Sequence, residues 1–265
     1  MKTLIFLLLT ATLCLKAHAI DWDTSGTVST SGGELYYRVS GTGKPLLLLH
    51  GYSGYGEQWQ SLLDEFVDGY RVIAIDLPGH GQSSKLQSDF IISDAARDIW
   101  QLMDQLGVKQ IYGVGYSAGG MTLLQMALQQ PSRVQSMVLA ASAFTVLEFR
   151  SDEPFELLPE AYQRDLLRNH NGDMERIRLL LSAKYVSDIT LPDLRDLKTP
   201  TLLVSGDRDQ SFPLSVVVET YSTLPQAKLW VVPGVGHALF WPWGGSERLA
   251  KQFPAEVSRF FREFR

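Results

Sequence analysis

The chain contains 265 residues, of which 45% are hydrophobic and 20% are charged, with 24 Lys and Arg against 29 Asp and Glu. This composition is ordinary for a globular protein, and the length suits one large domain or a domain with an insertion. The slight acidic excess, without any basic run, argues against nucleic acid or an anionic membrane as the main partner.

Residues 1–19 have the features of a secretory signal peptide. Lys2 precedes the apolar run Leu4–Leu15, which is too short to span a bilayer, and residues 17–19 (Ala-His-Ala) fit a small-x-small cleavage site. The alternative is an uncleaved N-terminal anchor. We predict cleavage after Ala19, export to the periplasm or the medium, and no stable membrane insertion afterwards. The mature chain would then contain no cysteine, and so neither a disulfide nor a thiolate metal site.

The first part of the mature chain predicts strands. Thr27–Thr30 and Glu34–Val39 alternate in part around Ser-Gly-Gly, which indicates a hairpin. Pro45–Leu49 is wholly apolar, as a central parallel strand buried on both faces would be. The glycine that follows, in His50-Gly51-Tyr52, allows backbone N–H groups to face a ligand. We expect His50 to brace this loop by hydrogen bonding and to transfer no proton.

Strands and helices then alternate as far as residue 143. Glu57–Phe66 is predicted to be a helix and Val72–Ile75 a buried strand, which runs into the turn Asp-Leu-Pro-Gly-His-Gly-Gln-Ser. We expect His80 to hold this turn. A helix over Asp94–Leu106 ends at a glycine, and Val134–Ala140 is a further strand. This alternation is typical of a parallel sheet covered by helices on both faces.

The segment Gln110–Leu124 contains Gly-Tyr-Ser-Ala-Gly between a short apolar strand and a helix. Ser117 would therefore occupy a sharp strand-to-helix turn, where a side chain two residues before or after it would clash. Such a turn exposes the serine hydroxyl beside the N–H groups of the helix N-terminus. The alternative is a glycine-rich connector in which Ser117 is an ordinary helix N-cap.

Residues 144–198 interrupt the alternation. They contain no convincing strand but several amphipathic helical stretches, including Phe155–Leu167 and Met174–Tyr185. Such a long insertion cannot be a simple loop. We predict a small helical cap over residues 144–198, inserted into a core formed by residues 20–143 and 199–265.

The last part of the chain carries an acid and a base in the order that a nucleophilic serine requires. The strand Pro200–Ser205 ends in Gly-Asp-Arg-Asp, which offers Asp207 and Asp209. The strand Ala227–Val232 ends in Pro-Gly-Val-Gly-His, which places His237 on a loop just after it. A helix near Glu247–Phe264 closes the chain.

Together these motifs resemble the α/β-hydrolase superfamily, in the branch of small capped serine esterases, and the resemblance covers nearly the whole mature chain. It implies a mostly parallel sheet flanked by helices, with a helical cap. It also implies that the last residue of Gly-x-x-Asp, Asp209, is the triad acid and that Asp207 belongs to the turn. Serine at the nucleophile position disfavours epoxide or haloalkane hydrolysis, for which family members carry aspartate.

The expected chemistry is hydrolysis of a carboxylic ester, or of a related lactone or thioester, of a small and largely apolar substrate. His237 would deprotonate Ser117, Asp209 would orient His237, and the backbone N–H groups of Tyr52 and Ala118 would bind the oxyanion. Neither a metal nor an organic cofactor is required. Aromatic side chains near the triad could line the substrate pocket, or could pack in the core: Tyr116, Phe144, Phe149, Phe240, Trp241 and Trp243.

Two other functions are compatible with the same residues. One is a sensor of the hydrolase fold that binds a small ligand with slow or single turnover. The other is a C–C bond hydrolase or a cofactor-free perhydrolase, which also use serine. Predicted export favours an enzyme over a sensor, because a cytoplasmic regulatory partner would be out of reach.

Overall fold

The computed structural model describes residues 21–146, 154–241 and 244–264. The predicted signal segment 1–19, Phe149 and Trp243 therefore lie outside the described residues. Eight strands form one sheet in the order β1-β2-β4-β3-β6-β7-β9-β10. They are β1 (Thr24–Thr30), β2 (Gly33–Ser40), β3 (Lys44–Leu49), β4 (Tyr70–Ile75), β6 (Ile111–Tyr116), β7 (Val134–Ala140), β9 (Thr201–Gly206) and β10 (Ala227–Val232).

The predicted parallel sheet is confirmed from β4 to β10. The hairpin of β1 and β2 is antiparallel and joins the sheet through an antiparallel pairing of β2 with β4, and all other neighbours are parallel. Because side chains alternate along a strand, each central strand supplies both faces. Leu47 and Leu49 of β3 enter one core, and Leu46 and Leu48 enter the other.

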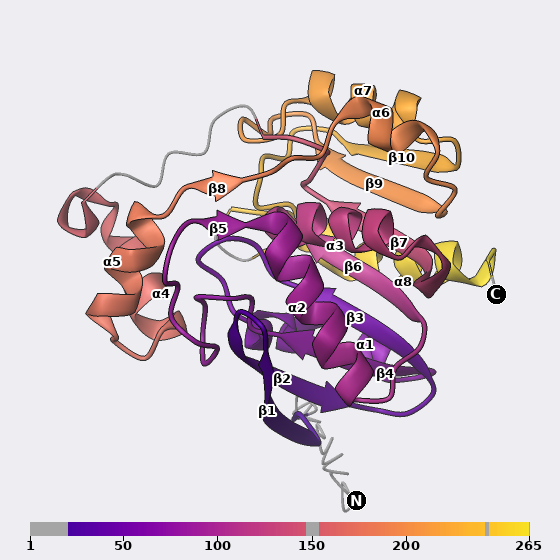
Figure 1. Cartoon of the computed structure of the whole chain (residues 1–265). Helices are drawn as coiled ribbons and strands as arrows, with labels where there is room; N and C mark the ends of the chain where they lie inside the picture. Colours follow the sequence, from indigo (N-terminus) through magenta and orange to yellow (C-terminus); the bar gives the residue numbers. More distant parts are fainter. Residues whose placement is uncertain (1–20, 147–153, 242–243, 265) are drawn as a thin grey trace, which may run out of the picture.

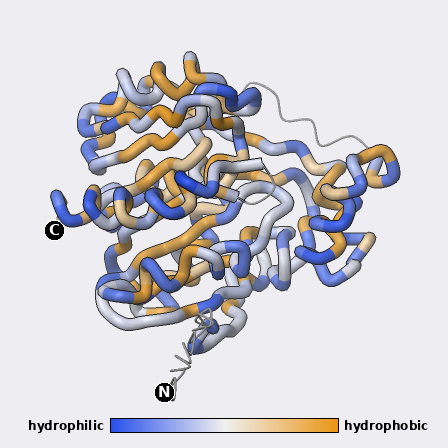
Figure 2. Tube along the Cα trace, turned by 180° about the vertical axis from the view of Figure 1, so that it is seen from behind, coloured by the Kyte–Doolittle hydropathy of each residue, from blue (hydrophilic) through white to orange (hydrophobic). Residues whose placement is uncertain are grey.

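Helices cover both faces of this sheet (Figure 1). The core on one face includes residues of α2 (Ile92–Gln105), α3 (Ala118–Gln129), α6 (Leu191–Arg195) and α7 (Leu214–Thr223). The core on the other face includes residues of α1 (Gln60–Phe66) and α8 (Glu247–Arg262). Figure 2 shows the apolar residues concentrated along the strands and the hydrophilic residues toward the outside. Within the described residues, no helix combines the length and apolarity needed to cross a bilayer.

The predicted helical stretches between β7 and β9 are present as α4 (Glu160–Asn169) and α5 (Met174–Ser182), which lie to one side of the sheet in Figure 1. We call α4 and α5 the inserted helices. They have a small core of their own, formed by Leu158, Leu166, Ile177 and Leu181. The expectation of no strand here was wrong, because β8 (Tyr185–Val186) pairs in parallel with β5 (Phe90–Ile91).

Three short 3₁₀ helices complete the described elements. η1 (Gly56–Trp59) leads into α1, so the helix predicted over Glu57–Phe66 begins as a 3₁₀ turn. η2 (Pro131–Arg133) connects α3 to β7, and η3 (Phe155–Leu157) precedes α4. The sheet brings the loops after β3, β6, β9 and β10 to the same edge, because these strands are parallel and adjacent or nearly so. Ligands bind at this edge in open α/β folds.

Candidate active site

Ser117 lies between β6 and α3 in a backbone conformation that only a constrained turn imposes. Its φ is 52° and its ψ is −120°, a combination that is costly for a residue with a side chain. A Cβ at Gly115 would lie 2.4 Å from the carbonyl oxygen of Gly119, and a Cβ at Gly119 would lie 2.4 Å from that of Leu49. The predicted requirement for both glycines is therefore confirmed.

The Ser117 side chain does not cap α3, so the alternative of an ordinary N-cap is wrong. Its Oγ instead lies 3.0 Å from Nε2 of His237. On the other side of the same imidazole, Nδ1 lies 2.8 Å from Oδ2 of Asp209. The structure thus brings together the serine, the histidine and the acid in the arrangement that an activated nucleophile needs.

Backbone donors hold the Asp209 carboxylate in place. Its side chain is fully buried, and Oδ1 accepts hydrogen bonds from the N–H groups of Ser211 (2.9 Å) and Phe212 (3.0 Å). Because Oδ1 is used in this way, Oδ2 is directed at His237. Asp207 has a different role, since its Oδ1 accepts from the N–H of Gly234 at 2.6 Å and joins the two loops. This is the assignment that the resemblance implied for the two aspartates.

Neighbouring aromatic residues orient His237. The Tyr116 hydroxyl donates to the His237 carbonyl at 2.9 Å, and the Phe212 ring stacks on the imidazole with centroids 5.8 Å apart. Burial raises the pKa of Tyr116 well above its usual value, so this hydroxyl stays protonated and keeps its donor role. The His237 side chain retains 28% exposure, which leaves a route for substrate and water.

The two residues predicted to donate to the oxyanion, Tyr52 and Ala118, each line a cavity that also includes Ser117. Ala118 is the first residue of α3, where backbone N–H groups have no partner within the helix. The backbone before Tyr52 passes close to Ser117, because a Cβ at Gly51 would lie 3.2 Å from the serine Cβ and 2.8 Å from the Tyr116 ring. The absence of a side chain at Gly51 therefore allows the loop after β3 to approach the serine closely.

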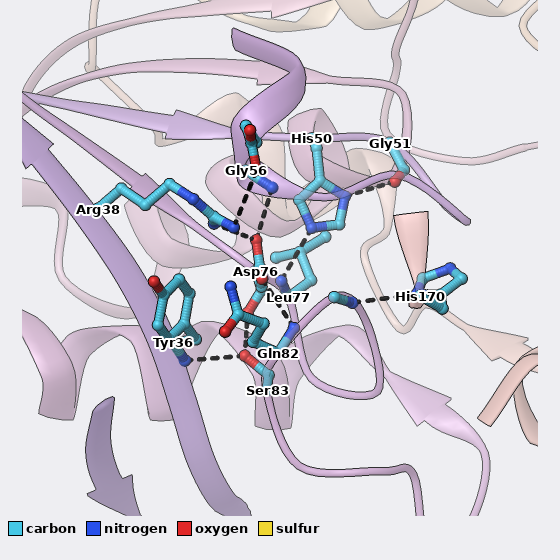
Figure 3. A network of polar contacts seen from close by, with 12 residues as sticks. Tyr36, Arg38, His50, Gly51, Gly56, Asp76, Leu77, Gln82, Ser83 and His170 are labelled. Atoms are coloured by element: carbon cyan, nitrogen blue, oxygen red, sulfur yellow. Dashed lines mark hydrogen bonds and ion pairs between the residues drawn. The ribbon is translucent and has the colours of Figure 1, made fainter. Parts of the chain in front are cut away.

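His50 holds two backbone segments together, as predicted (Figure 3). His80 contacts a carbonyl of the turn in which it lies. Nε2 of His50 accepts from the N–H of Leu77 at 2.9 Å, so Nδ1 carries the proton and donates to the Gly51 carbonyl at 2.6 Å. Nδ1 of His80 lies 2.9 Å from the Pro78 carbonyl. Both rings are fully buried, and burial lowers the pKa of His50 to about 4 and that of His80 well below 6.5.

Two cavities meet at Ser117, His237 and Ser211. The larger has a volume of about 420 Å³ and lies beneath α4, which contributes Tyr162, Asp165 and Asn169 to its wall. The smaller has about 30 Å³ and an apolar lining that includes Met121, Val146 and Phe212. Tyr52 lines the larger cavity and Ala118 the smaller one.

The aromatic residues predicted to line the pocket or to pack in the core divide between these two roles. Tyr116 lines the larger cavity, but Phe240 and Trp241 line neither one and are 4% and 3% exposed. They pack in the core behind the sheet, against Trp59, because the loop after His237 turns inward. Phe144 packs against the opposite core. Sequence reasoning missed Tyr162, Asp165 and Asn169, whose only signal was the amphipathic pattern of their helix.

Within the described residues, no three His, Cys, Asp or Glu side chains gather in a way that could hold a metal ion. His237 and Asp209 instead form a series of contacts that begins at Ser117.

Residues 44–191 match the family described as the alpha/beta hydrolase fold, which is more than half of the chain, and the chain therefore belongs to this family. The chain is similar to a pimeloyl-[acyl-carrier protein] methyl ester esterase of Nitrosomonas europaea, with 26% identity over 246 residues that cover 78% of this chain and 93% of that protein. It is also similar to a non-heme haloperoxidase of Rhodococcus erythropolis, with 26% identity over 253 residues, 80% of this chain and 92% of that protein.

Among solved structures, carboxylesterase CesB of Bacillus subtilis superposes with a TM-score of 0.74 and 20% identity, over 91% of this chain and 92% of that chain. At this identity the likeness shows the fold alone. Esterases are thus among the relatives of this chain, and so are enzymes named for other reactions.

Proposed function

We propose that the protein is a serine hydrolase that cleaves carboxylic esters of small, uncharged substrates through an acyl-enzyme. The observation that carries this proposal is the unbroken line of hydrogen-bonded groups from Ser117 through His237 to Asp209, which starts at a strained turn. Strain of this kind is retained where it serves a site. The esterase among the relatives supports the same reaction class.

The proposed reaction proceeds in two halves. His237 Nε2 takes the Ser117 proton as Oγ attacks the ester carbonyl, and the N–H groups of Tyr52 and Ala118 stabilise the resulting oxyanion. The protonated histidine then gives its proton to the departing alcohol, and the C–O bond breaks to leave an acyl-serine. Water deprotonated by His237 attacks this acyl group, and collapse of the second intermediate releases the acid and returns the proton to Ser117.

Because the two cavities meet at Ser117, the two sides of an ester bond attacked by this serine could each occupy one of them. The larger, at about 420 Å³, is in the range of small-molecule sites. The smaller, at about 30 Å³, has room for a group of only a few atoms. Among the described residues that line them, Asp165 is the one carboxylate and there is no Lys or Arg. These walls favour an uncharged substrate over an anionic one.

A panel of p-nitrophenyl esters of increasing acyl length tests the reaction on the chain from Ile20 onward. We expect many turnovers on at least the short members, and labelling of Ser117 by a fluorophosphonate. Ser117→Ala should fold and lose about 10⁴-fold in kcat, whereas Ser215→Ala, at an exposed position of α7, should behave as wild type. A single stoichiometric burst would support the sensor instead. Comparable turnover by pure Ser117→Ala would refute the serine mechanism.

We also propose that the protein is exported, on the basis of Lys2, the run Leu4–Leu15 and the small residues at 17–19. The substrates of an exported enzyme would be esters that reach the periplasm or the medium.

A further inference from the structure

We infer that helix α4 holds the oxyanion loop in its working conformation through Ser53, so that Tyr162 and Asn169 are positioning residues for the catalytic step. The oxyanion loop is defined here as residues 50–54, which follow β3. The inference rests on the proposed function, because it assigns the Tyr52 N–H to the oxyanion site.

Ser53 is a strained residue next to the proposed donor. Its φ is 60°, in the left-handed region that a residue with a side chain rarely adopts, and it is 8% exposed. Conformations of this kind cost on the order of 1–3 kcal/mol and persist only where surrounding contacts impose them. If these contacts were lost, rotation about this φ would move Tyr52 relative to Ser117.

The contacts that impose the conformation come from the inserted helices. The Tyr162 hydroxyl donates to the Ser53 Oγ at 2.9 Å, and the Asn169 amide nitrogen donates to the Ser53 carbonyl at 3.1 Å. The Tyr52 hydroxyl donates to the Leu180 carbonyl of α5. Two consecutive residues of the oxyanion loop are therefore bound to α4 and α5 at three points.

Hydrogen bonds within the oxyanion loop, and one from the segment after β4, also hold this loop. His50 Nδ1 donates to the Gly51 carbonyl (Figure 3). The N–H of Gly54 donates to the same carbonyl at 3.1 Å. His50 is itself fixed by the Leu77 N–H. The loop is thus held by these bonds and by the inserted helices, and only the second set of contacts depends on where those helices lie.

The inserted helices have their own attachment to the core. The N–H of Gly81 donates to Nδ1 of His170, directly after α4, at 3.1 Å (Figure 3). Arg176 of α5 donates to the carbonyls of Gly79 (3.1 Å) and Ser83 (2.5 Å) in the adjacent turn. Because these bonds fix α4 and α5 without the help of Ser53, the helices can impose a conformation on the loop.

Tyr162 and Asn169 also line the larger cavity, so a role in contacting substrate must be separated from positioning. The two roles differ in how an effect depends on the substrate. Loss of a substrate contact raises KM, and this increase in KM becomes larger with acyl length. A displaced oxyanion donor instead lowers kcat by the same factor for every ester. Removal of a whole donor costs about 10²–10³ in kcat, and we expect a displaced donor to cost about 10-fold.

The test compares Tyr162→Phe with wild type on p-nitrophenyl acetate and p-nitrophenyl hexanoate. We expect kcat to fall about 10-fold on both esters with KM changed less than about 3-fold. The Ki of a short alkyl trifluoromethyl ketone, which forms a tetrahedral adduct with an oxyanion, should rise by the same factor as kcat/KM falls. Arg164→Gln, on the same helix with its side chain 70% exposed, is the matched control and should behave as wild type.

A second variant keeps the test decisive if Tyr162→Phe folds poorly. Ser53→Ala removes the same hydrogen bond from the other side, so it should reproduce the loss, and the double variant should lose no more than either single one. Wild-type kcat in both variants, or a loss that grows with acyl length, would overturn the inference. Failure of the esterase proposal is distinguishable, because in the same assay wild type would show no sustained turnover, or Ser117→Ala would retain it.

Discussion

Three buried histidines link the stability of the fold to pH. His50, His80 and His170 are at most 1% exposed. The ring centroid of His80 lies 5.1 Å from that of His50 and 6.0 Å from that of His170. Burial lowers the pKa of His50 and His170 to about 4, and that of His80 well below 6.5. Arg176 lowers the pKa of His80 and His170 further, while Asp76 opposes the shift at His50 and His170.

The sign of the effect follows from these directions. The unfolded chain takes up protons near pH 6.5, whereas the folded chain does not do so until about pH 4. The contribution of these neutral histidines to the free energy of unfolding is therefore fully present above pH 6.5. It decreases as the pH falls from about 6.5 to about 4. A difference of about 2.5 pKa units corresponds to about 3 kcal/mol for each of His50 and His170. That loss is large against the 5–15 kcal/mol total that is typical of folded proteins.

Urea titrations at pH 7, 6 and 5, followed by tryptophan fluorescence, measure this loss. Between about pH 4 and pH 6.5, away from both limits, His50 and His170 together should make the free energy of unfolding change by about 3 kcal/mol per pH unit. His170→Gln removes one of the titrating groups, so its slope should be smaller than that of wild type by about 1.4 kcal/mol per pH unit. Arg164→Gln should keep the wild-type slope. Identical slopes for His170→Gln and wild type, or a stability that is flat from pH 7 to 5, would refute the reasoning.

Two further predictions concern the acid and the export signal. Asp209→Asn should lower kcat by about 10³–10⁴-fold with little change in KM, because the amide favours the wrong tautomer of His237. Asp207→Asn should be much milder, since Asp207 contacts the Gly234 N–H and the Arg208 guanidinium and not His237, and the reverse ranking would move the acid to Asp207. N-terminal sequencing of protein from its own host should give a chain that begins at Ile20; intact Met1 in the cytosol would contradict export.

The sheet could be predicted because its central strands are buried on both faces. The half-buried edge strand β10 was predicted with its bounds, Ala227–Val232. The central strand β7, which is almost wholly buried, was also predicted with its bounds, Val134–Ala140. Runs of this kind, bounded by turn residues, have few other stable conformations. The serine turn was predictable for a similar reason, because Gly115 and Gly119 are required by contacts with neighbouring backbone.

The elements that escaped prediction depend on partners far away in the chain. β5 and β8 have two residues each and exist only because Phe90 and Ile91 pair with Tyr185 and Val186. The same holds for the wall of the larger cavity. Tyr162 meets Ser53 across 109 positions of sequence, and nothing local to α4 marks the residues that face the site. The triad motifs therefore predicted which residues meet at the candidate site, while the residues that shape the cavity required the structure.

The aromatic residues that pack in the core still bear on the proposed catalysis, through the position of His237. Phe240 and Trp241 begin three residues after the histidine and are buried against Trp59, and Phe240 also packs against Phe253 of α8 with ring centroids 4.3 Å apart. Large aromatic side chains dominate core energetics, so the loop cannot move without exposing them. Burial of these rings thus fixes one end of the loop, and the Tyr116 hydroxyl fixes the histidine itself. The imidazole is therefore placed 3.0 Å from Ser117 by the packing of the core, before any substrate arrives.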